Sequence, residues 1–294
     1  MRQNTTFVHI TDLHVGDPKF ADDHLYSDTS ATLATVLADI KALSPVPQFI
    51  VASGDLTNRG DVDSFAELKR LFAKSGLDLP VVWALGNHDT REGFYRAMLD
   101  RDSDLAAPYF HDQVLADIHI ITLDSSTPGK VGGTIEPEQF DWLEETLVAH
   151  ADLPKLIVVH HGPALDEDNP DMEWEALTIA DTLKLRDLLV EHDVIGILSG
   201  HVHYDRMSNW YGIPLIVGMG QHAAMDVRQL HEGLRLVSGT SFAVGTIRPS
   251  GLTLSLIPQP SDRRELHTIS YERLHQHIAD TQEELHADDR SAAE

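Results

Sequence analysis

The chain has 294 residues, of which 42% are apolar, enough for a hydrophobic core and too many for a disordered polypeptide. It contains no cysteine, which excludes disulfides and thiolate metal sites and permits a reducing compartment. The 47 acidic residues against 22 basic ones give a formal charge of −25, which argues against nucleic-acid or anionic-membrane partners.

Short apolar runs rich in β-branched residues alternate with helical patterns along most of the chain. Up to residue 199 this alternation predicts an α/β sheet with crossover helices. The expected strands are Thr6–Ile10, Phe49–Ser53, Val81–Leu85, Ile118–Leu123, Leu156–His160, Val194–Ser199, Pro214–Val217, Ser241–Ile247 and Leu252–Ile257. The expected helices are Ala31–Leu43, Ser64–Lys74, Pro137–His150 and Thr178–Glu191.

Two local patterns refine this outline. The capping box Ser64-x-x-Glu67 predicts where the second helix begins. From about Pro214 to Pro258 the pattern becomes strand–turn–strand, and we expect these strands to form a second sheet within one catalytic domain, residues 1–260. Residues 261–294 are charged, with apolar residues at loosely helical spacing, and predict a helical tail that docks on the surface, frays or contacts another subunit.

No apolar run approaches the roughly 20 residues that cross a bilayer. The first residues also lack the apolar stretch of a signal peptide. We therefore expect a cytoplasmic protein without stable membrane association.

Most residues that can bind a metal ion follow directly after an expected strand. In an open α/β sheet, ligands bind in the crevice at the carboxyl ends of the strands, so we expect these side chains to converge there. They are Asp12, His14, Asp55, Asn87, His160, His201 and His203.

The spacing and chemistry of this set favour two metal ions. On an extended chain, Asp12 and His14 point to the same side, and so do His201 and His203. Nitrogen and oxygen donors without a thiolate suit Fe, Mn, Zn or Co better than Ca. Seven side chains are too many for one tetrahedral ion, so we expect two ions that share the Asp55 carboxylate.

The same residues form recognisable motifs. Asp12-x-His14, Gly54-Asp55, Gly86-Asn87-His88-Asp89, His160 and Gly200-His201-x-His203 resemble the motifs of calcineurin-like metallophosphoesterases, as does Gly133 followed by Glu138–Leu143. The resemblance covers about residues 6–260 and is strongest to bacterial class III cyclic-nucleotide phosphodiesterases and related glycerophosphodiesterases. It implies a four-layer α/β/β/α sandwich of two mixed β-sheets flanked by helices, with the metal site at the carboxyl ends of the strands.

The resemblance also implies roles. One ion would be bound by Asp12, His14, Asp55 and His203, and the other by Asp55, Asn87, His160 and His201. A hydroxide bridging the ions would attack phosphorus, so Asp55 and Asn87 are expected to be catalytic. His88 would stabilise the phosphoryl oxygens or protonate the leaving group. The implied partners are a small phosphodiester, such as cAMP, cGMP or a glycerophosphodiester, and further copies of the chain in a homodimer or larger homo-oligomer.

Three other functions stay open on this reasoning. A phosphomonoesterase could use the same metals, although serine/threonine phosphatases of this superfamily usually have Glu where this chain has Asp89. A repair nuclease shares the motifs, but the acidic charge argues against nucleic-acid binding. A non-catalytic scaffold usually has a degraded ligand set, and this chain keeps all seven residues.

Several further residues admit two interpretations. We expect His9 to be structural, and strand alternation predicts that His161 points away from His160 and is packed or supports the ligands from behind. Asp89 is expected to orient a histidine ring. A surface or packing role and a substrate contact are both open for Asn58, Arg59, His222 and Trp174, with packing favoured for Trp174 and solvation for His222. The acidic stretch Asp166–Glu175 forms either a rim over the site or a mobile solvated loop, and the loop is favoured.

Overall fold

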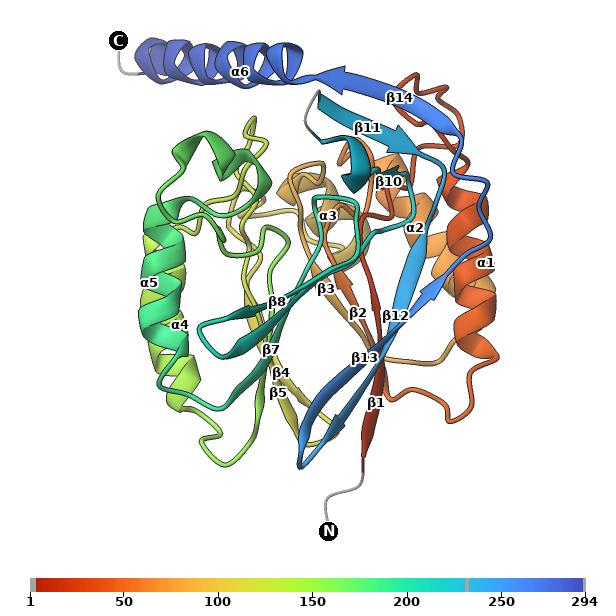
Figure 1. Cartoon of the computed structure of the whole chain (residues 1–294), viewed down its shortest axis with the longest axis vertical. Helices are drawn as coiled ribbons and strands as arrows, with labels where there is room; N and C mark the ends of the chain where they lie inside the picture. The colour runs from red at the N-terminus through yellow and green to blue at the C-terminus, as the bar shows by residue number, and fades with distance from the viewer. Residues whose placement is uncertain (1–3, 231–232, 293–294) are drawn as a thin grey trace.

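The computed structural model describes residues 4–230 and 233–292. Two mixed β-sheets pack face to face, and helices cover the outer face of each sheet (Figure 1). The four-layer α/β/β/α sandwich implied by the motifs is confirmed. Each expected strand and helix is present, with ends shifted by no more than two residues.

The first sheet has the strand order β13-β12-β1-β2-β3. Its strands β1 (Thr5–Ile10), β2 (Phe49–Ser53) and β3 (Val81–Ala84) are parallel, whereas β12 (Ser241–Arg248) and β13 (Gly251–Pro258) run antiparallel to their neighbours. Its outer face is covered by α1 (Thr29–Lys41), α2 (Val62–Ser75) and α3 (Arg91–Leu99).

The second sheet has the order β4-β5-β6-β7-β9-β8. Its parallel strands are β5 (Ile118–Thr122), β6 (Lys155–Val158), β7 (Val194–Ser199) and β9 (Ile213–Val217). Antiparallel strands β4 (His111–Leu115) and β8 (Arg206–Trp210) form its edges, and α4 (Pro137–Val148) and α5 (Ile179–Leu189) cover its outer face.

Apolar side chains fill the space between the sheets. Because side chains alternate along a strand, Phe7 of β1 points between the sheets while Val8 points to the outer helices. Phe7 stacks on Phe49 of β2, with ring centroids 5.3 Å apart. This buried core holds the parallel strands of both sheets so that their carboxyl ends lie at the same end of the sandwich.

Two details of the sequence interpretation are wrong. The strands after Pro214 do not form the second sheet alone: β9 pairs with β7, whereas β12 pairs with β1 in the first sheet. Helix α2 begins at Val62 and not at a Ser64 capping box, because the Asp61 carboxylate accepts hydrogen bonds from the Ser64 backbone N–H and hydroxyl at 2.8 and 2.7 Å.

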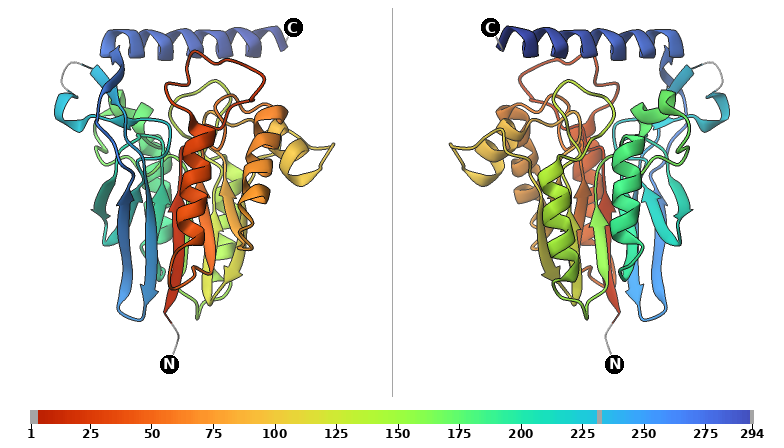
Figure 2. Two further views of the ribbon diagram at one scale, coloured as in Figure 1. Left: turned by 90° about the vertical axis from the view of Figure 1, so that its right-hand side faces the viewer. Right: turned by 90° about the vertical axis from the view of Figure 1, so that its left-hand side faces the viewer.

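The last part of the chain crosses the carboxyl end of the sandwich. Strands β10 (Ala224–Met225), β11 (Gly233–Val237) and β14 (Glu265–Ser270) form a small third sheet, which the sequence did not predict. Helix α6 (Tyr271–Ala292) follows and lies across the end opposite the N-terminus (Figures 1 and 2). Among the described residues, no helix has the length and hydrophobicity needed to cross a membrane.

Candidate metal centre

Five loops meet at one end of the sandwich. Each follows the carboxyl end of a parallel strand: β1, β2, β3, β6 or β7. The structure brings together the seven side chains that the sequence singled out, namely Asp12, His14, Asp55, Asn87, His160, His201 and His203.

The first group of donors surrounds the end of β1. The Asp12 Oδ1 lies 3.3 Å from His203 Nε2, and His203 Nε2 lies 3.2 Å from His14 Nε2. His14 Nε2 is also 3.7 Å from Asp55 Oδ2. The donor atoms of these four residues all lie within 4.8 Å of one another, close enough to bind one ion.

The second group shares Asp55 with the first. Asp55 Oδ2 lies 3.3 Å from His160 Nε2, and Asn87 Oδ1 lies 3.0 Å from His201 Nδ1. His160 Nε2 is buried and lacks a hydrogen-bond partner among the described residues. A buried nitrogen lone pair facing a carboxylate is costly unless a cation or proton lies between them.

The backbone at these residues is unusual. Asp12, His14, Asp55, His201 and His203 all have φ between 44° and 77°, in the left-handed region that residues other than glycine rarely adopt. The paired side chains therefore converge through tight turns beyond the strand ends and not through the extended chain that their spacing suggested. Five such residues gathered in one place are typical of a functional site, where the surrounding structure holds the backbone strain.

Hydrogen bonds behind the rings fix which nitrogen faces the centre. His160 Nδ1 donates to the Ser53 carbonyl at 2.9 Å, and His203 Nδ1 donates to the Ala223 carbonyl at 3.0 Å. His201 is turned the other way, with Nε2 2.7 Å from the Trp174 carbonyl. Histidines that bind metals commonly use one ring nitrogen in this way, which leaves the lone pair of the other for the ion.

The electrostatics also suit cations. Burial lowers the pKa of His201 to about 4 and that of His14 well below its usual value, so both rings are neutral donors. Burial opposes charge on His160 as well, but the Asp55 carboxylate outweighs it and raises the pKa of His160 to about 9. In the absence of an ion a proton therefore holds this pair together, and a bound metal would replace it. The donor set fits two metal ions.

His161 lies beside the centre and has the supporting role expected as one of its two interpretations, but the direction predicted from strand alternation is wrong. β6 ends at Val158, so the alternation does not extend to residues 160 and 161. His161 Nε2 lies 3.2 Å from Asn87 Oδ1 and 3.0 Å from the Val131 carbonyl, and Nδ1 lies 2.8 Å from Ser125 Oγ. These contacts position the Asn87 amide.

We therefore expect His161→Phe, which keeps a buried ring but loses both hydrogen-bonding nitrogens, to weaken binding of one of the two metal ions about 10- to 100-fold. Titration of metal-free protein with Mn²⁺ measures this affinity. The matched control is His119→Phe, another buried histidine, which pairs with Asp112 on β4. Equal affinities for the two variants would show that His161 only fills space.

Asp89 does not orient a histidine as predicted. Its buried carboxylate accepts hydrogen bonds from the backbone N–H groups of Gly86, Leu56 and Thr57 at 2.9–3.0 Å. Asp89 therefore holds the loop after β3 against the loop after β2, and so fixes the distance between Asn87 and Asp55. His9 has the structural role expected, with Nε2 2.8 Å from Ser53 Oγ.

His222 is buried at the centre and not solvated in a loop. Its ring lies 4.8 Å from that of His14 and stacks on Tyr26 with centroids 5.3 Å apart. Its donor atom lies within 4.8 Å of those of His14 and His203. Sequence reasoning missed this because the loop after β9 has no motif that places it.

His88 is exposed and lines a cavity of about 570 Å³. Its backbone N–H donates to Asp55 Oδ1 at 2.9 Å, and its Nδ1 lies 3.0 Å from the Asn58 carbonyl. With Nδ1 occupied by that carbonyl, Nε2 is the nitrogen that can act on a ligand. The cavity is also lined by Asn87, Arg59, Arg91, Ser126 and Thr127.

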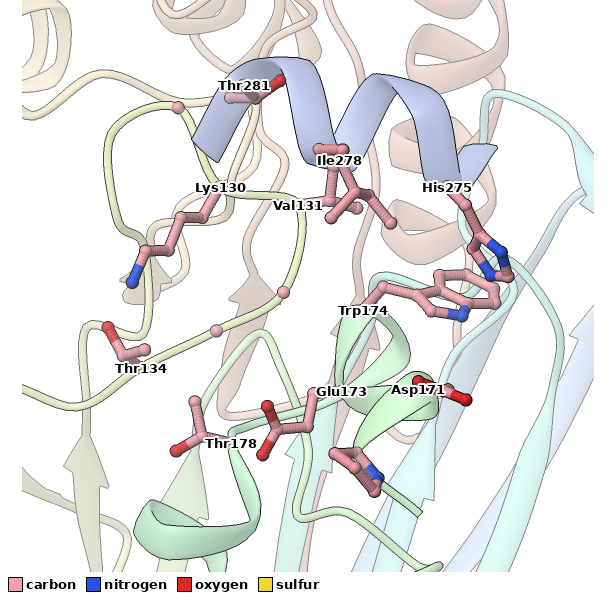
Figure 3. Close-up of a pocket in the computed structure, with 15 residues that line it drawn as sticks. Lys130, Val131, Thr134, Asp171, Glu173, Trp174, Thr178, His275, Ile278 and Thr281 are labelled. Carbon is pink, nitrogen blue, oxygen red and sulfur yellow. The ribbon is translucent and has the colours of Figure 1, made fainter. Parts of the chain in front are cut away.

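A second cavity of about 510 Å³ lies between α6 and the loop of residues 129–134 (Figure 3). The later part of the acidic stretch forms the 3-10 helix Pro170–Glu175. Trp174 belongs to this helix and packs against Leu274 of α6. Trp174 thus has the packing role favoured from the sequence, and its carbonyl supports His201 on the side of the metal centre.

Comparison with known proteins identifies the family. Residues 5–205 match the family model of calcineurin-like phosphoesterases. The chain is 36% identical to a probable cyclic nucleotide phosphodiesterase of Rhodococcus erythropolis and 30% identical to a cAMP/cGMP dual specificity phosphodiesterase of Mycobacterium tuberculosis. These alignments cover 75% of this chain and 72% of the first relative, and 80% and 73% for the second.

A dimetal phosphatase from Danio rerio has the same fold, with a TM-score of 0.62 and 15% sequence identity over 91% of this chain and 99% of that one. With the family match over more than half of its length, the chain belongs to the calcineurin-like phosphoesterases.

Proposed function

We propose that this metal-dependent enzyme hydrolyses a small phosphodiester, namely a 3′,5′-cyclic nucleotide such as cAMP or cGMP, to the nucleoside monophosphate. The observation that carries the proposal is the convergence of seven donor side chains around Asp55, with His88 exposed beside them. The names of the relatives from Rhodococcus erythropolis and Mycobacterium tuberculosis support the substrate class.

Each residue of the centre has a proposed task. Asp12, His14, Asp55 and His203 hold one ion, and Asp55, Asn87, His160 and His201 hold the other. The ions, of Fe, Mn, Zn or Co, supply positive charge for an anionic substrate and lower the pKa of water to about 7. In its doubly protonated form, His88 keeps its Nδ1–H on the Asn58 carbonyl and donates from Nε2 a proton to the alkoxide that leaves phosphorus, or a hydrogen bond to the phosphoryl oxygens.

The negative charge of the protein makes the metal ions important for substrate binding as well as for catalysis. A formal charge of −25 repels phosphate esters, so productive binding requires local positive charge. Arg59 and Arg91 line the cavity at His88, but both are paired with carboxylates, those of Asp22 and of Asp124 and Glu136. Binding of the substrate phosphate would therefore depend mainly on the positive charge of the metal centre.

A substrate panel tests the proposal. Purified protein is loaded in turn with Mn, Fe, Zn and Co and assayed on cAMP, cGMP, a glycerophosphodiester, bis(p-nitrophenyl) phosphate and p-nitrophenyl phosphate. We expect the highest kcat/KM on a cyclic nucleotide. Preference for the glycerophosphodiester would mean that the proposed substrate is wrong, and preference for the monoester would mean that the proposed reaction is wrong. Inactivity on all five compounds would reject the proposed hydrolysis of small phosphate esters. The cytoplasmic location and the homo-oligomeric state stay predictions.

A further inference from the structure

His14 differs from the other histidines of the centre in the group that its outer ring nitrogen contacts. His160, His201 and His203 each use a backbone carbonyl as the acceptor for their outer nitrogen. His14 Nδ1 instead lies 3.0 Å from the side-chain Oδ1 of Asn58. A carbonyl of the backbone offers only an acceptor, whereas a side-chain amide offers a donor at one end and an acceptor at the other.

We propose that Asp22 and Asn58 form a positioning pair that fixes the tautomer and orientation of His14, so that His14 presents its Nε2 lone pair to a metal ion. The proposal rests on the metal-binding function proposed above. It assigns a role to Asp22, which lies in the loop between β1 and α1 and belongs to none of the motifs.

The contacts decide which end of the amide faces His14. Asn58 Nδ2 donates to Asp22 Oδ2 at 2.8 Å. An ionised carboxylate only accepts hydrogen bonds, so the NH₂ end of Asn58 must face Asp22 and its oxygen must face His14. That oxygen requires a hydrogen on His14 Nδ1. The lone pair is then on Nε2, the atom 3.2 Å from His203 Nε2 and 3.7 Å from Asp55 Oδ2.

Arg59 holds Asp22 in this geometry. Its Nε and Nη2 donate to Oδ2 and Oδ1 of Asp22 at 2.6 and 3.1 Å, a bidentate pair that fixes the carboxylate plane. The Asp22 side chain is 3% exposed and Asn58 is 7% exposed, so water cannot readily substitute for either partner. The chain Arg59–Asp22–Asn58–His14 thus runs from the surface to the metal centre.

Three variants test the pair through the metal affinity of the full-length protein. Asn58→Leu removes the acceptor for His14. We expect this variant to bind one of the two Mn²⁺ equivalents about 10- to 100-fold more weakly and the other with unchanged affinity. Asp22→Ala frees the amide to rotate, and we expect a smaller loss at the same equivalent. The exchange Asp22→Asn with Asn58→Asp keeps a donor facing an acceptor and keeps an acceptor for His14, so we expect affinity within a few fold of the parent.

The control is Asp23→Ala, the neighbouring exposed carboxylate of the same loop. Asp23→Ala is expected to bind both equivalents like the parent, and thermal unfolding of each metal-free variant verifies that the fold is kept. If Asn58→Leu fails to fold, Asp22→Ala and the exchange variant decide. Parental affinity in Asp22→Ala, or an exchange variant as weak as Asn58→Leu, would overturn the proposal. If the parent protein itself bound no metal, the proposed function would fail instead.

Discussion

Replacing Asp55 by Asn is expected to lower kcat about 1000-fold or more and to remove at least one of the two metal ions. The Asp55 carboxylate lies between the two groups of donors, with Oδ2 3.3 Å from His160 Nε2 and 3.7 Å from His14 Nε2. An amide has no charge and would turn its NH₂ toward these nitrogens. The loss of several kcal/mol of charge stabilisation corresponds to this factor, since each 1.36 kcal/mol is tenfold in rate.

The shape of the site makes Asn the right replacement. The backbone of Gly86 approaches so closely that a Cβ at that position would lie 2.2 Å from Asp55 Oδ1. A larger side chain at residue 55 would therefore displace the loop after β3, whereas Asn fits and keeps an acceptor for the His88 N–H. We expect the metal-free variant to unfold at a lower temperature than the parent, because it loses the buried ion pair between Asp55 and His160, so metal content is measured well below that temperature.

The measurements are metal content by elemental analysis and kcat on cAMP and bis(p-nitrophenyl) phosphate. Asp124→Asn is the control, because Asp124 is also a buried carboxylate but pairs with Arg91 at 2.9 Å outside the donor cluster. We expect that variant to lose stability and keep its metals. An Asp55→Asn protein that retained two ions and parental activity would refute the shared role of this carboxylate.

The position of the centre could be predicted from the sequence because it depends on a general property of parallel sheets. Asp12, Asp55, Asn87, His160 and His201 each follow a strand, and parallel strands end at one edge. The geometry of the individual turns could not be predicted in this way. The left-handed φ angles of Asp12 and His14 result from tertiary contacts, such as the hydrogen bonds from their N–H groups to the carbonyls of Gly54 and Asp55.

The pairing of strands that are far apart in the sequence was the second feature that could not be predicted. The alternation in β12 indicates a strand, but only its register with β1, in which Thr5 faces Ile247, assigns it to the first sheet. The supporting residues His161, His222 and Asp22 were missed or misplaced for a similar reason. Their contacts join loops that are far apart in sequence, and a single sequence has no periodicity that reports such contacts.

Replacing His88 by Ala is expected to lower kcat/KM on cAMP about 100- to 10,000-fold while both metal ions remain bound. His88 is exposed on the loop after β3, and its ring packs edge-on against His14 with centroids 4.7 Å apart. The Asn58 carbonyl occupies Nδ1, so Nε2 faces the cavity where the leaving group would lie. Among the contacts described, the His88 side chain touches the metal-binding residues only through this ring packing. Removal of the His88 ring therefore leaves all seven donor side chains in place.

A comparison of two substrates distinguishes the roles open to His88. The ribose alkoxide that leaves cAMP is a poor leaving group and needs a proton, whereas p-nitrophenolate is a good one and needs little help. If His88 is a general acid, His88→Ala loses far more activity on cAMP than on bis(p-nitrophenyl) phosphate. Equal losses would mean that His88 binds the phosphoryl oxygens, which both substrates share. His24→Ala, an exposed histidine between β1 and α1, serves as the control, and we expect it to match the parent on both substrates because His24 does not line the cavity at His88.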